Sequence, residues 1–293
     1  MKKYTFLLLL LLIAAVTYAA PARRVSKKVK QSDGTELTVM LSGDEAMHFY
    51  MTLDGKPLVK EVNGDFSYAT FSAAGEFVST KCLAHDESAR SVAEKELIGS
   101  IDYAAMSVSM NKASAVRSAM YKAAAQKAGS QIVPEGDVNI AVLLVQFKDA
   151  KFTYTKEDLN NILNTKDYVY ENPIANSIGS ARDYFMAQSD GKFRPNFVVT
   201  DIVTLDNNMA YYGGNDSSDN DQRATYMVKE GIQKADNAGF DFAACDNNGD
   251  GEVEFIYCIY AGYSESYGAD ENTIWPHQWQ LSKRQLMILL SFS

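Results

Sequence analysis

Apolar residues in the second half of the chain occur in continuous runs separated by mixed segments. Asn139–Phe147 is an apolar, β-branched run of the kind that forms a strand buried on both faces. Asn196–Leu205 and the stretch FIYCIYAGY at residues 255–263 predict two further strands. The mixed segments between these runs are typical of helices. Strands that alternate with helices indicate an α/β domain from about residue 137 onward.

The predicted helices carry recognisable start signals. Thr155, followed by Asp158 three positions later, predicts a capped helix that extends to Leu163. Ser180 is expected to cap a second helix. A third lies within residues 221–239, where an apolar stripe precedes a terminal glycine. The members of that stripe are Tyr226, Met227, Ile232 and Ala235. The intervening stretch Tyr211–Gly214 is predicted to be a loop with aromatic packing.

Residues 36–80 follow a different pattern, in which short apolar stretches alternate with turn signals. Asp54-Gly55 and Asn63-Gly64 each separate two strand-like runs, and Ala74-Gly75 repeats the spacing. Asp-Gly and Asn-Gly are the dipeptides that type I′ hairpin turns favour. The pattern predicts a small antiparallel β-meander.

The first residues resemble a secretory signal peptide. Lys2 and Lys3 precede an eleven-residue apolar stretch, Phe6–Val16, and small residues follow, with cleavage expected after Ala19. Eleven helical residues reach about 16 Å, whereas a bilayer core is about 30 Å thick. The mature protein is therefore predicted to be secreted, with no membrane span. The predicted organisation is a signal peptide at 1–19, a β-rich domain at 20–103, a helix-prone linker at 104–136, an α/β domain at 137–283 and a tail at 284–293.

Charge and cysteine content narrow the function classes. The net charge of −9 and the pI near 4.9 argue against a nucleic-acid partner, which needs a basic face, and are compatible with binding of divalent cations. Cys82, Cys245 and Cys258 are too few to form a disulfide framework in a chain of this length. Free thiols are expected, and a single Cys245–Cys258 bridge is the alternative.

The stretch CDNNGDGEVEF at residues 245–255 concentrates acidic and amide side chains before a predicted strand. Alternating oxygen-bearing side chains surround a hard cation such as Ca²⁺, and Gly251 permits the sharp turn. The predicted calcium ligands are Asp246, Asn248, Asp250, Glu252 (through its backbone carbonyl) and Glu254. Position twelve of the loop is Tyr257 rather than glutamate, so this is not a helix-loop-helix calcium site. The alternative is a polar turn that binds no ion.

The sequence contains few residues that could catalyse hydrolysis. The chain contains three histidines, His48, His85 and His277, and the shortest separation between two of them is the 37 positions from His48 to His85. There is no H-E-x-x-H motif for zinc and no G-x-S-x-G motif for a nucleophilic serine. Cys258 lies inside an apolar strand, where cysteine is usually an inert small hydrophobe. A cysteine peptidase that uses His277 is therefore disfavoured.

Five stretches in a fixed order carry a family resemblance. They are VLLVQFKDAKFT (142–153), GSARDYFMAQSDGKFRPNFVVTDIVTL (179–205), YYGGND (211–216), DFAACDNNGDGEVEFIYCIYAGY (241–263) and IWPHQW (274–279). Residues 137–280 resemble the front half of the secreted zinc metallopeptidase domain of the immune inhibitor A family. Residues 36–100 resemble the pro-region that precedes such domains.

The resemblance implies a fold and a function. The fold class would be α+β or α/β, the first part of a zincin-like domain with a mixed sheet and helices, preceded by a small antiparallel β pro-region. The function would be that of an exported endopeptidase that cleaves protein or peptide substrates with zinc-activated water. The resemblance also supports a structural calcium ion in the acidic loop. A Cys82 thiolate held on zinc is a further, weaker possibility for such a pro-region.

The catalytic part of the family pattern is missing from this chain. In the family, the zinc-binding helix follows the IWPH segment, whereas here RQLMILLSFS (284–293) does not resemble the family. The zinc ligands are therefore predicted to be absent, as after a frameshift or premature stop, and the chain to be inactive. The alternative function is a non-catalytic secreted module that binds calcium or a partner.

Overall fold

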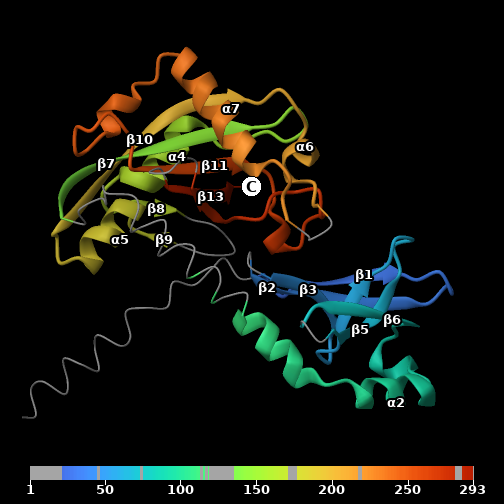
Figure 1. The fold of residues 1–293 in the computed structure, drawn as a ribbon. Helices are drawn as coiled ribbons and strands as arrows, with labels where there is room; N and C mark the ends of the chain where they lie inside the picture. Colours follow the sequence, from blue (N-terminus) through green and yellow to red (C-terminus); the bar gives the residue numbers. More distant parts are fainter. Residues whose placement is uncertain are drawn as a thin grey trace, which may run out of the picture.

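The computed structural model describes residues 22–44, 47–72, 75–112, 115, 118, 135–170, 177–216, 220–280 and 286–292. The predicted signal peptide and most of the predicted linker lie outside these residues. The described chain forms an N-terminal antiparallel sheet and a second, mostly parallel sheet covered by helices (Figure 1).

Six consecutive strands form the N-terminal sheet, each antiparallel to the next. The strands are β1 (Ser26–Lys30), β2 (Glu36–Asp44), β3 (Met47–Thr52), β4 (Pro57–Lys60), β5 (Phe66–Phe71) and β6 (Phe77–Leu83). The predicted meander is confirmed, and β1 extends it by one strand that the turn signals did not indicate. A short 3₁₀ helix, η1 (Glu87–Ala89), and the helix α2 (Val92–Ser100) follow, and residues 103–112 are helical.

The hairpin turns differ from the predicted type. The amide of Gly55 donates to the carbonyl of Thr52, and the amide of Thr52 donates to the carbonyl of Lys56, each at 2.9 Å. Gly55 has φ 82°, whereas Asp54 is not among the described residues with positive φ. A type I′ turn needs positive φ at both central residues, so the prediction of that type was wrong. A left-handed glycine that closes a three-residue loop explains the same Asp-Gly signal.

A small core joins the N-terminal sheet to α2. Ser91 and Glu94 form a capping box that begins α2. The buried residues of this core are Leu37, Val39, Leu58, Phe66, Tyr68, Ala84 and Ile98. This core lies between one face of the meander and one helix, so it is small for a domain of this size. Buried polar contacts of Arg90 and His85 supplement it.

The second sheet has the order β10-β7-β11-β13-β12, and its first four strands are parallel. The strands are β7 (Gly136–Gln146), β10 (Phe193–Thr204), β11 (Phe255–Ala261), β12 (Gln278–Gln280), antiparallel at the edge, and β13 (Leu286–Phe292). The three predicted strands are confirmed. β13 lies within the tail set apart at 284–293, and it pairs with β11 and β12. A separate two-stranded ribbon joins β8 (Val169–Tyr170) to β9 (Ser177–Ile178).

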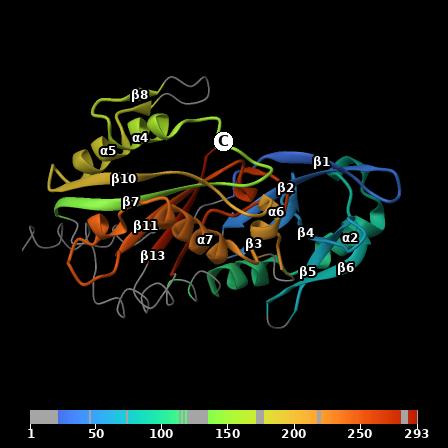
Figure 2. The same cartoon turned by 90° about the horizontal axis from the view of Figure 1, so that it is seen from above.

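Helices cover both faces of this sheet (Figure 2). Leu143 and Val145 of β7 face a cluster that includes Met227 of α7 (Ala224–Asn237), whereas Val142 and Leu144 face Leu159 of α4 (Lys156–Asn164). The side chains of β7 therefore alternate between two cores, as its apolar run predicted. The remaining helices are α5 (Ala181–Gln188), α6 (Met209–Gly213), η2 (Phe242–Cys245) and η3 (Glu265–Tyr267).

The predicted helix starts are confirmed, and two local predictions were wrong. Thr155 with Asp158, and Ser180 with Asp183, form complete capping boxes. Tyr226 is 50% exposed, because the buried side of α7 is formed by smaller residues around Met227. The predicted loop at Tyr211–Gly214 is largely the short helix α6. Across the described residues, no helix is both long and apolar enough to cross a bilayer.

Candidate functional site

The acidic loop lies between η2 and β11, at the amino end of the buried strand. The carboxylate of Asp246 accepts hydrogen bonds from the amides of Gly249 (2.7 Å) and Gly251 (2.8 Å). These backbone bonds, that from Gly251 first, lower the pKa of Asp246. Both glycines have positive φ, which lets the chain turn around this carboxylate.

Asn248 and Asp250 continue the same turn pattern. The side-chain oxygen of Asn248 accepts from the amide of Asp250 at 2.8 Å, and that of Asp250 accepts from the amide of Glu252 at 3.0 Å. Such local bonds are the usual way in which Asx side chains stabilise turns. In the structure, therefore, these oxygens face backbone amides of the loop.

The base of the loop is fixed to the sheet. Glu254 is 6% exposed and accepts from the backbone and side-chain amides of Asn247 at 3.3 Å. Asn247 also bonds to β7, where the backbone of Asn139 donates to its side chain and accepts from it, each at 2.9 Å. The loop is thus held in register with the central strand.

The donor chemistry of the loop is compatible with calcium. Its donors are the hard oxygens that calcium prefers, and Oε2 of Glu252 is buried without a hydrogen-bond partner in the described part of the chain. However, among the described residues no three His, Cys, Asp or Glu side chains are arranged as around a metal ion. The donor set fits calcium in chemistry, and the calcium site itself stays a prediction.

A second polar cluster lies at the opposite end of the strands from the acidic loop, beyond the carboxyl ends of β10 and β11. Glu265 follows β11, Asp221 follows β10 and α6, and the side-chain amide of Asn215 donates to both oxygens of Glu265 at 3.2 and 3.3 Å. The backbone amide of Trp275 donates to Oδ2 of Asp221 at 3.0 Å. Ligand sites in parallel sheets form at this edge, where separate loops converge.

Two histidines contact this cluster from different parts of the chain. The imidazole of His277 lies 3.8 Å from Oδ2 of Asp221, and its Nδ1 is 2.7 Å from the carbonyl of Trp275. His48, on strand β3 of the N-terminal sheet, lies with Nε2 3.9 Å from Oε1 of Glu265. The His48 ring stacks on the Trp275 ring with centroids 4.3 Å apart.

The two carboxyl groups of this cluster are almost entirely buried. The side chains of Asp221 and Glu265 are 4% and 3% exposed. Burial raises the pKa of Asp221 to about 8, against the lowering effect of the Trp275 amide, and the charge of Glu265 raises it further. Within the described residues, Oδ1 of Asp221, Oδ1 of Asn215 and Nε1 of Trp275 are buried without hydrogen-bond partners. This end of the sheet therefore buries two carboxyl groups among other polar side chains.

The remaining candidates have structural roles. His85 lies between Glu94 (2.7 Å) and Asp33 (2.9 Å), which hold it in the N-terminal sheet. The three cysteines are free thiols, as expected. Burial raises the pKa of Cys258, and also that of Cys82, where Glu94 contributes too, so a Cys82 thiolate on zinc is not favoured. The described residues do not fit a zinc site.

We call this second polar cluster the carboxyl-edge cluster; its members are His48, Asn215, Asp221, Glu265, Trp275 and His277. The sequence did not indicate it, because its members come from five segments of the chain. Their spacing has no motif. One signal was present: IWPH and the segment after FIYCIYAGY follow the same buried strand, and YYGGND follows another. Loops that follow parallel strands meet at the carboxyl ends of the sheet, so this signal could have placed these stretches near one another.

Comparisons with known proteins agree with the order of these elements. A family model described as the catalytic domain of immune inhibitor A peptidase M6 matches residues 139–289, which run from β7 into β13. The chain is also similar to immune inhibitor A of Bacillus thuringiensis subsp. alesti, with 25% identity over 189 residues. That alignment covers 52% of this chain and 27% of the relative, so the chain spans about a quarter of the relative's length.

Proposed function

This chain belongs to the immune inhibitor A family of M6 peptidases, and we propose that it derives from an exported zinc metalloendopeptidase that acts on protein substrates. The observation that carries the proposal is the match over residues 139–289, which covers about half of the chain. The matched residues include most of the parallel sheet, its helices and the members of the carboxyl-edge cluster other than His48. Export is proposed from the resemblance of residues 1–19 to a signal peptide.

The zinc chemistry is assigned to the family and not to residues of this chain. When bound, zinc in such an enzyme activates the water that attacks the peptide bond. Here the histidines contact carboxylates and Trp275 in two separate places, and the sequence has no H-E-x-x-H pair. We therefore propose that this polypeptide does not hydrolyse proteins by itself.

The acidic loop is proposed to hold a structural calcium ion. Its ligands would be Asp246, Asn248, Asp250, the backbone carbonyl of Glu252, and Glu254. The support is the oxygen-rich donor set, the two left-handed glycines and the tether to β7. Binding would replace loop hydrogen bonds with metal contacts and stabilise the entry to β11.

The N-terminal sheet is proposed to be a pro-region. The support is its resemblance at residues 36–100 and its position before the peptidase-family domain. A non-catalytic secreted module that binds calcium or a partner is the second candidate function. The specific observation in its favour is that the oxygen donors of the loop are present, whereas the described residues form no zinc site and the sequence has no H-E-x-x-H motif.

An assay with a fluorescent casein tests the catalytic part of the proposal. The purified chain is incubated with Zn²⁺, and the matched control is the His48→Ala/His277→Ala double variant. No turnover above buffer is expected from either protein. Turnover that a zinc chelator abolishes, and that the double variant lacks, would overturn it. Turnover shared by both proteins would instead identify a contaminating peptidase, and further purification must remove it.

A further inference from the structure

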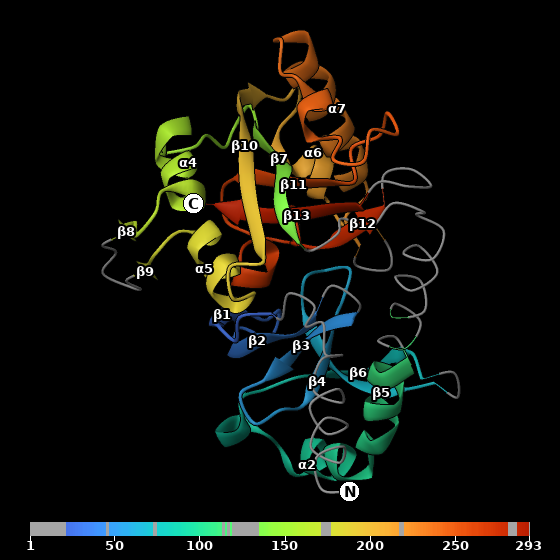
Figure 3. The same cartoon turned by 90° about the vertical axis from the view of Figure 1, so that its left-hand side faces the viewer.

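The first residues of β7 extend beyond the start of its neighbour β11. The strand β7 lies between β10 and β11 (Figure 3), and it pairs with β11 from Ala141 and Ile256 onward. Continued backward by two residues, this register would place Glu254 opposite Asn139, but β11 begins only at Phe255. At Asn139 the backbone of β7 therefore faces the acidic loop and not a β11 residue.

The side chain of Asn247 takes the place of the missing strand residue. Its Oδ1 accepts from the N–H of Asn139, and its Nδ2 donates to the carbonyl of Asn139, each at 2.9 Å. Facing residues of a hydrogen-bonded antiparallel pair exchange the same two bonds. One carboxamide group thus supplies both bonds that a strand residue would make.

The same arrangement occurs at the outer edge of β10. Oδ1 of Asn164, the last residue of α4, accepts from the N–H of Phe197 at 2.9 Å, and its Nδ2 donates to the Phe197 carbonyl at 2.8 Å. In both places an asparagine from outside the sheet pairs with the backbone of a strand. The two differ in what the asparagine belongs to, because Asn164 ends a helix, whereas Asn247 lies between the proposed ligands Asp246 and Asn248.

Asn247 joins both ends of the acidic loop to one point of β7. Its backbone N–H and its Nδ2 each lie 3.3 Å from Oε2 of Glu254, and Nδ2 lies 3.0 Å from the carbonyl of Cys245. The side chain of Asn139 adds a further bond, from its Nδ2 to the carbonyl of Ala244 at 2.7 Å. The start and the end of the loop are therefore fixed beside each other on β7.

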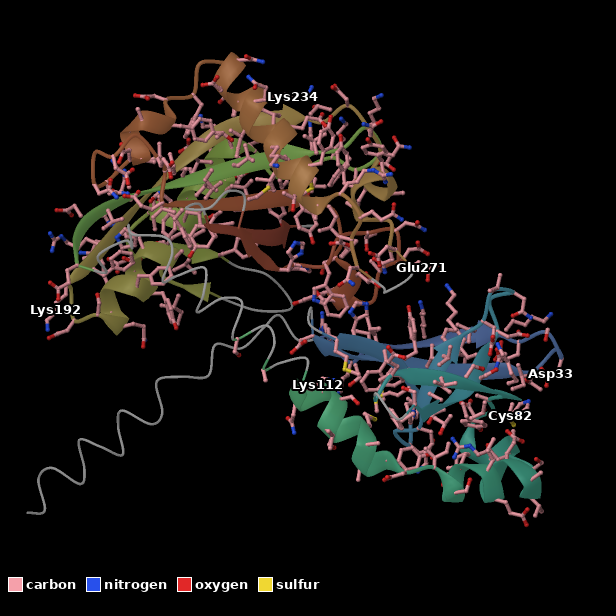
Figure 4. The ribbon with its side chains drawn as sticks, viewed as in Figure 1. Asp33, Cys82, Lys112, Lys192, Lys234 and Glu271 are labelled. Atoms are coloured by element: carbon pink, nitrogen blue, oxygen red, sulfur yellow. The ribbon has the colours of Figure 1, made fainter. Side chains whose placement is uncertain are left out.

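These bonds lie at the end of the α/β domain where β7 and β10 begin. The N–H of Gly136, the first residue of β7, donates to the carbonyl of Lys192 at 2.7 Å. Lys192 lies on the side of the domain remote from the N-terminal sheet, whereas Glu271 lies next to that sheet (Figure 4). The support of the acidic loop thus comes from its own domain.

We propose that Asn247 is the positioning residue of the acidic loop: its strand-like pair with Asn139 orders the proposed calcium ligands before an ion binds. A loop that is already ordered loses less conformational entropy on binding, so its affinity is higher. The inference rests on the proposed calcium site and adds to it a residue whose side chain is not one of the proposed ligands.

Calcium titration and hydrogen exchange of the full chain test this inference. Asn247→Ala removes both bonds to Asn139 and leaves the proposed ligands unchanged. The Kd for calcium, measured by isothermal titration with Ca²⁺ alone, should rise ~10-fold, as expected for the loss of two neutral hydrogen bonds. Without calcium, the amides of Gly249 and Gly251, which donate to Asp246, should exchange at least ~5-fold faster. The amide of Val142, in the middle of β7, should keep its protection.

Asn164→Ala is the matched control, because it removes the same pair of bonds at β10. It should lower the unfolding temperature without changing the calcium Kd or the exchange of the loop glycines. An unchanged Kd in Asn247→Ala, with calcium bound by the parent, would overturn the inference and leave the calcium site standing. An equal rise of the Kd in both variants would also overturn it, because the effect would then come from a general loosening of the sheet.

A parent chain that binds no calcium would remove the proposed calcium site, and the exchange measurement would then decide the inference. Faster exchange of Gly249 and Gly251 in Asn247→Ala, and not in Asn164→Ala, would support the positioning role. Unchanged exchange would overturn it.

Discussion

The imidazole of His48 stacks on the indole of Trp275, with ring centroids 4.3 Å apart and planes inclined by 18°. The two residues lie 227 positions apart, from 48 to 275; His48 is in β3, and Trp275 lies in the loop before β12. This stack joins the meander to the edge of the α/β domain at which the strand-end loops converge.

Replacing His48 distinguishes the contribution of ring stacking on Trp275 from the contribution of the histidine charge. His48→Phe should retain an aromatic contact, whereas His48→Ala should lose it, at a cost of about 0.5–1.5 kcal/mol to the interdomain contact. The measurement is the exchange protection of residues 264–277 at pH 6. His85→Ala, in the same sheet but away from the interface, should not change that protection directly. Equal protection in His48→Ala and the parent would show that the stack contributes nothing.

The N-terminal sheet should depend on Arg90 more than on any exposed ion pair. Its guanidinium is 4% exposed, binds both oxygens of Asp54 at 2.7 and 2.5 Å, and donates to the Tyr68 hydroxyl at 3.0 Å. Lysine cannot reproduce this fork, so Arg90→Lys should destabilise the meander by about 2–4 kcal/mol. Native-state hydrogen exchange at Phe66 measures the loss.

A matched exposed pair provides the control for Arg90. Lys28 and Glu36 lie 3.1 Å apart with side chains 70% and 65% exposed. Lys28→Ala should therefore cost less than about 1 kcal/mol. If the two variants lowered the free energy of unfolding equally, the buried fork would not be the reason for the stability of this sheet.

His85 predicts a pH dependence for the stability of the N-terminal sheet. Burial lowers its pKa, but hydrogen bonds to Asp33 and Glu94 outweigh this, so the pKa lies above 6.5. The stabilisation is complete below pH 6.5 and is lost as the pH rises through the folded value. The pKa of Glu94 is lowered, burial opposing its bonds to Ser91 and His85, so that group's contribution is lost on acidification below about 4.5.

The meander should therefore be most stable between about pH 4.5 and 6.5. His85→Gln should flatten the alkaline side of the profile and weaken the acid side, where the bonds from Ser91 to Glu94 remain. Urea unfolding monitored by circular dichroism at several pH values measures both limbs. A His85→Gln profile with an unchanged alkaline limb would assign that limb to another group.

The sequence predicted the α/β domain well because its signals are local. The apolar run of β7 and the pairs Thr155–Asp158 and Ser180–Asp183 each specify an element through residues only a few positions apart. The sequence located the hairpin turns but did not predict their turn type, because Asp-Gly fits both a type I′ turn and a three-residue loop closed by a left-handed glycine.

The carboxyl-edge cluster could not be predicted in the same way. His48 is a single histidine on a short strand, and its contact with Trp275 depends on how the N-terminal sheet packs against the loop before β12. The raised pKa of Asp221 depends on burial by loops from other strands. Its neighbours in sequence, Asn220 and Gln222, suggest an ordinary polar turn. The contact between His48 and Trp275 and the raised pKa of Asp221 therefore arise from long-range packing and not from residue type.

Gly213 should tolerate no side chain. A Cβ atom at this position would lie 2.6 Å from the carbonyl carbon of Thr273 and 2.8 Å from Ile274, so α6 packs directly on the backbone that precedes Trp275. Gly213→Ala should cost about 1–3 kcal/mol and disturb the stack with His48. Gly99→Ala, at an exposed position in α2 with open space around it, should instead stabilise its helix by about 0.5–1 kcal/mol. Thermal unfolding of both variants provides the comparison.

Calcium should raise the unfolding temperature if the acidic loop binds it. An ion that binds only the native state adds about 2.7 kcal/mol of stability at a concentration of one hundred times its Kd. Asp246 and Asp250 now accept loop amides, and calcium would take these oxygens as ligands. Asp250→Asn should therefore lose most of the calcium-dependent shift while folding without the ion. Asp241→Asn, in the preceding turn, is the control and should keep the full shift. Calorimetric scans with calcium, with magnesium and with a chelator would measure the effect, and identical scans would leave the loop a polar turn whose carboxylates bind only its own backbone.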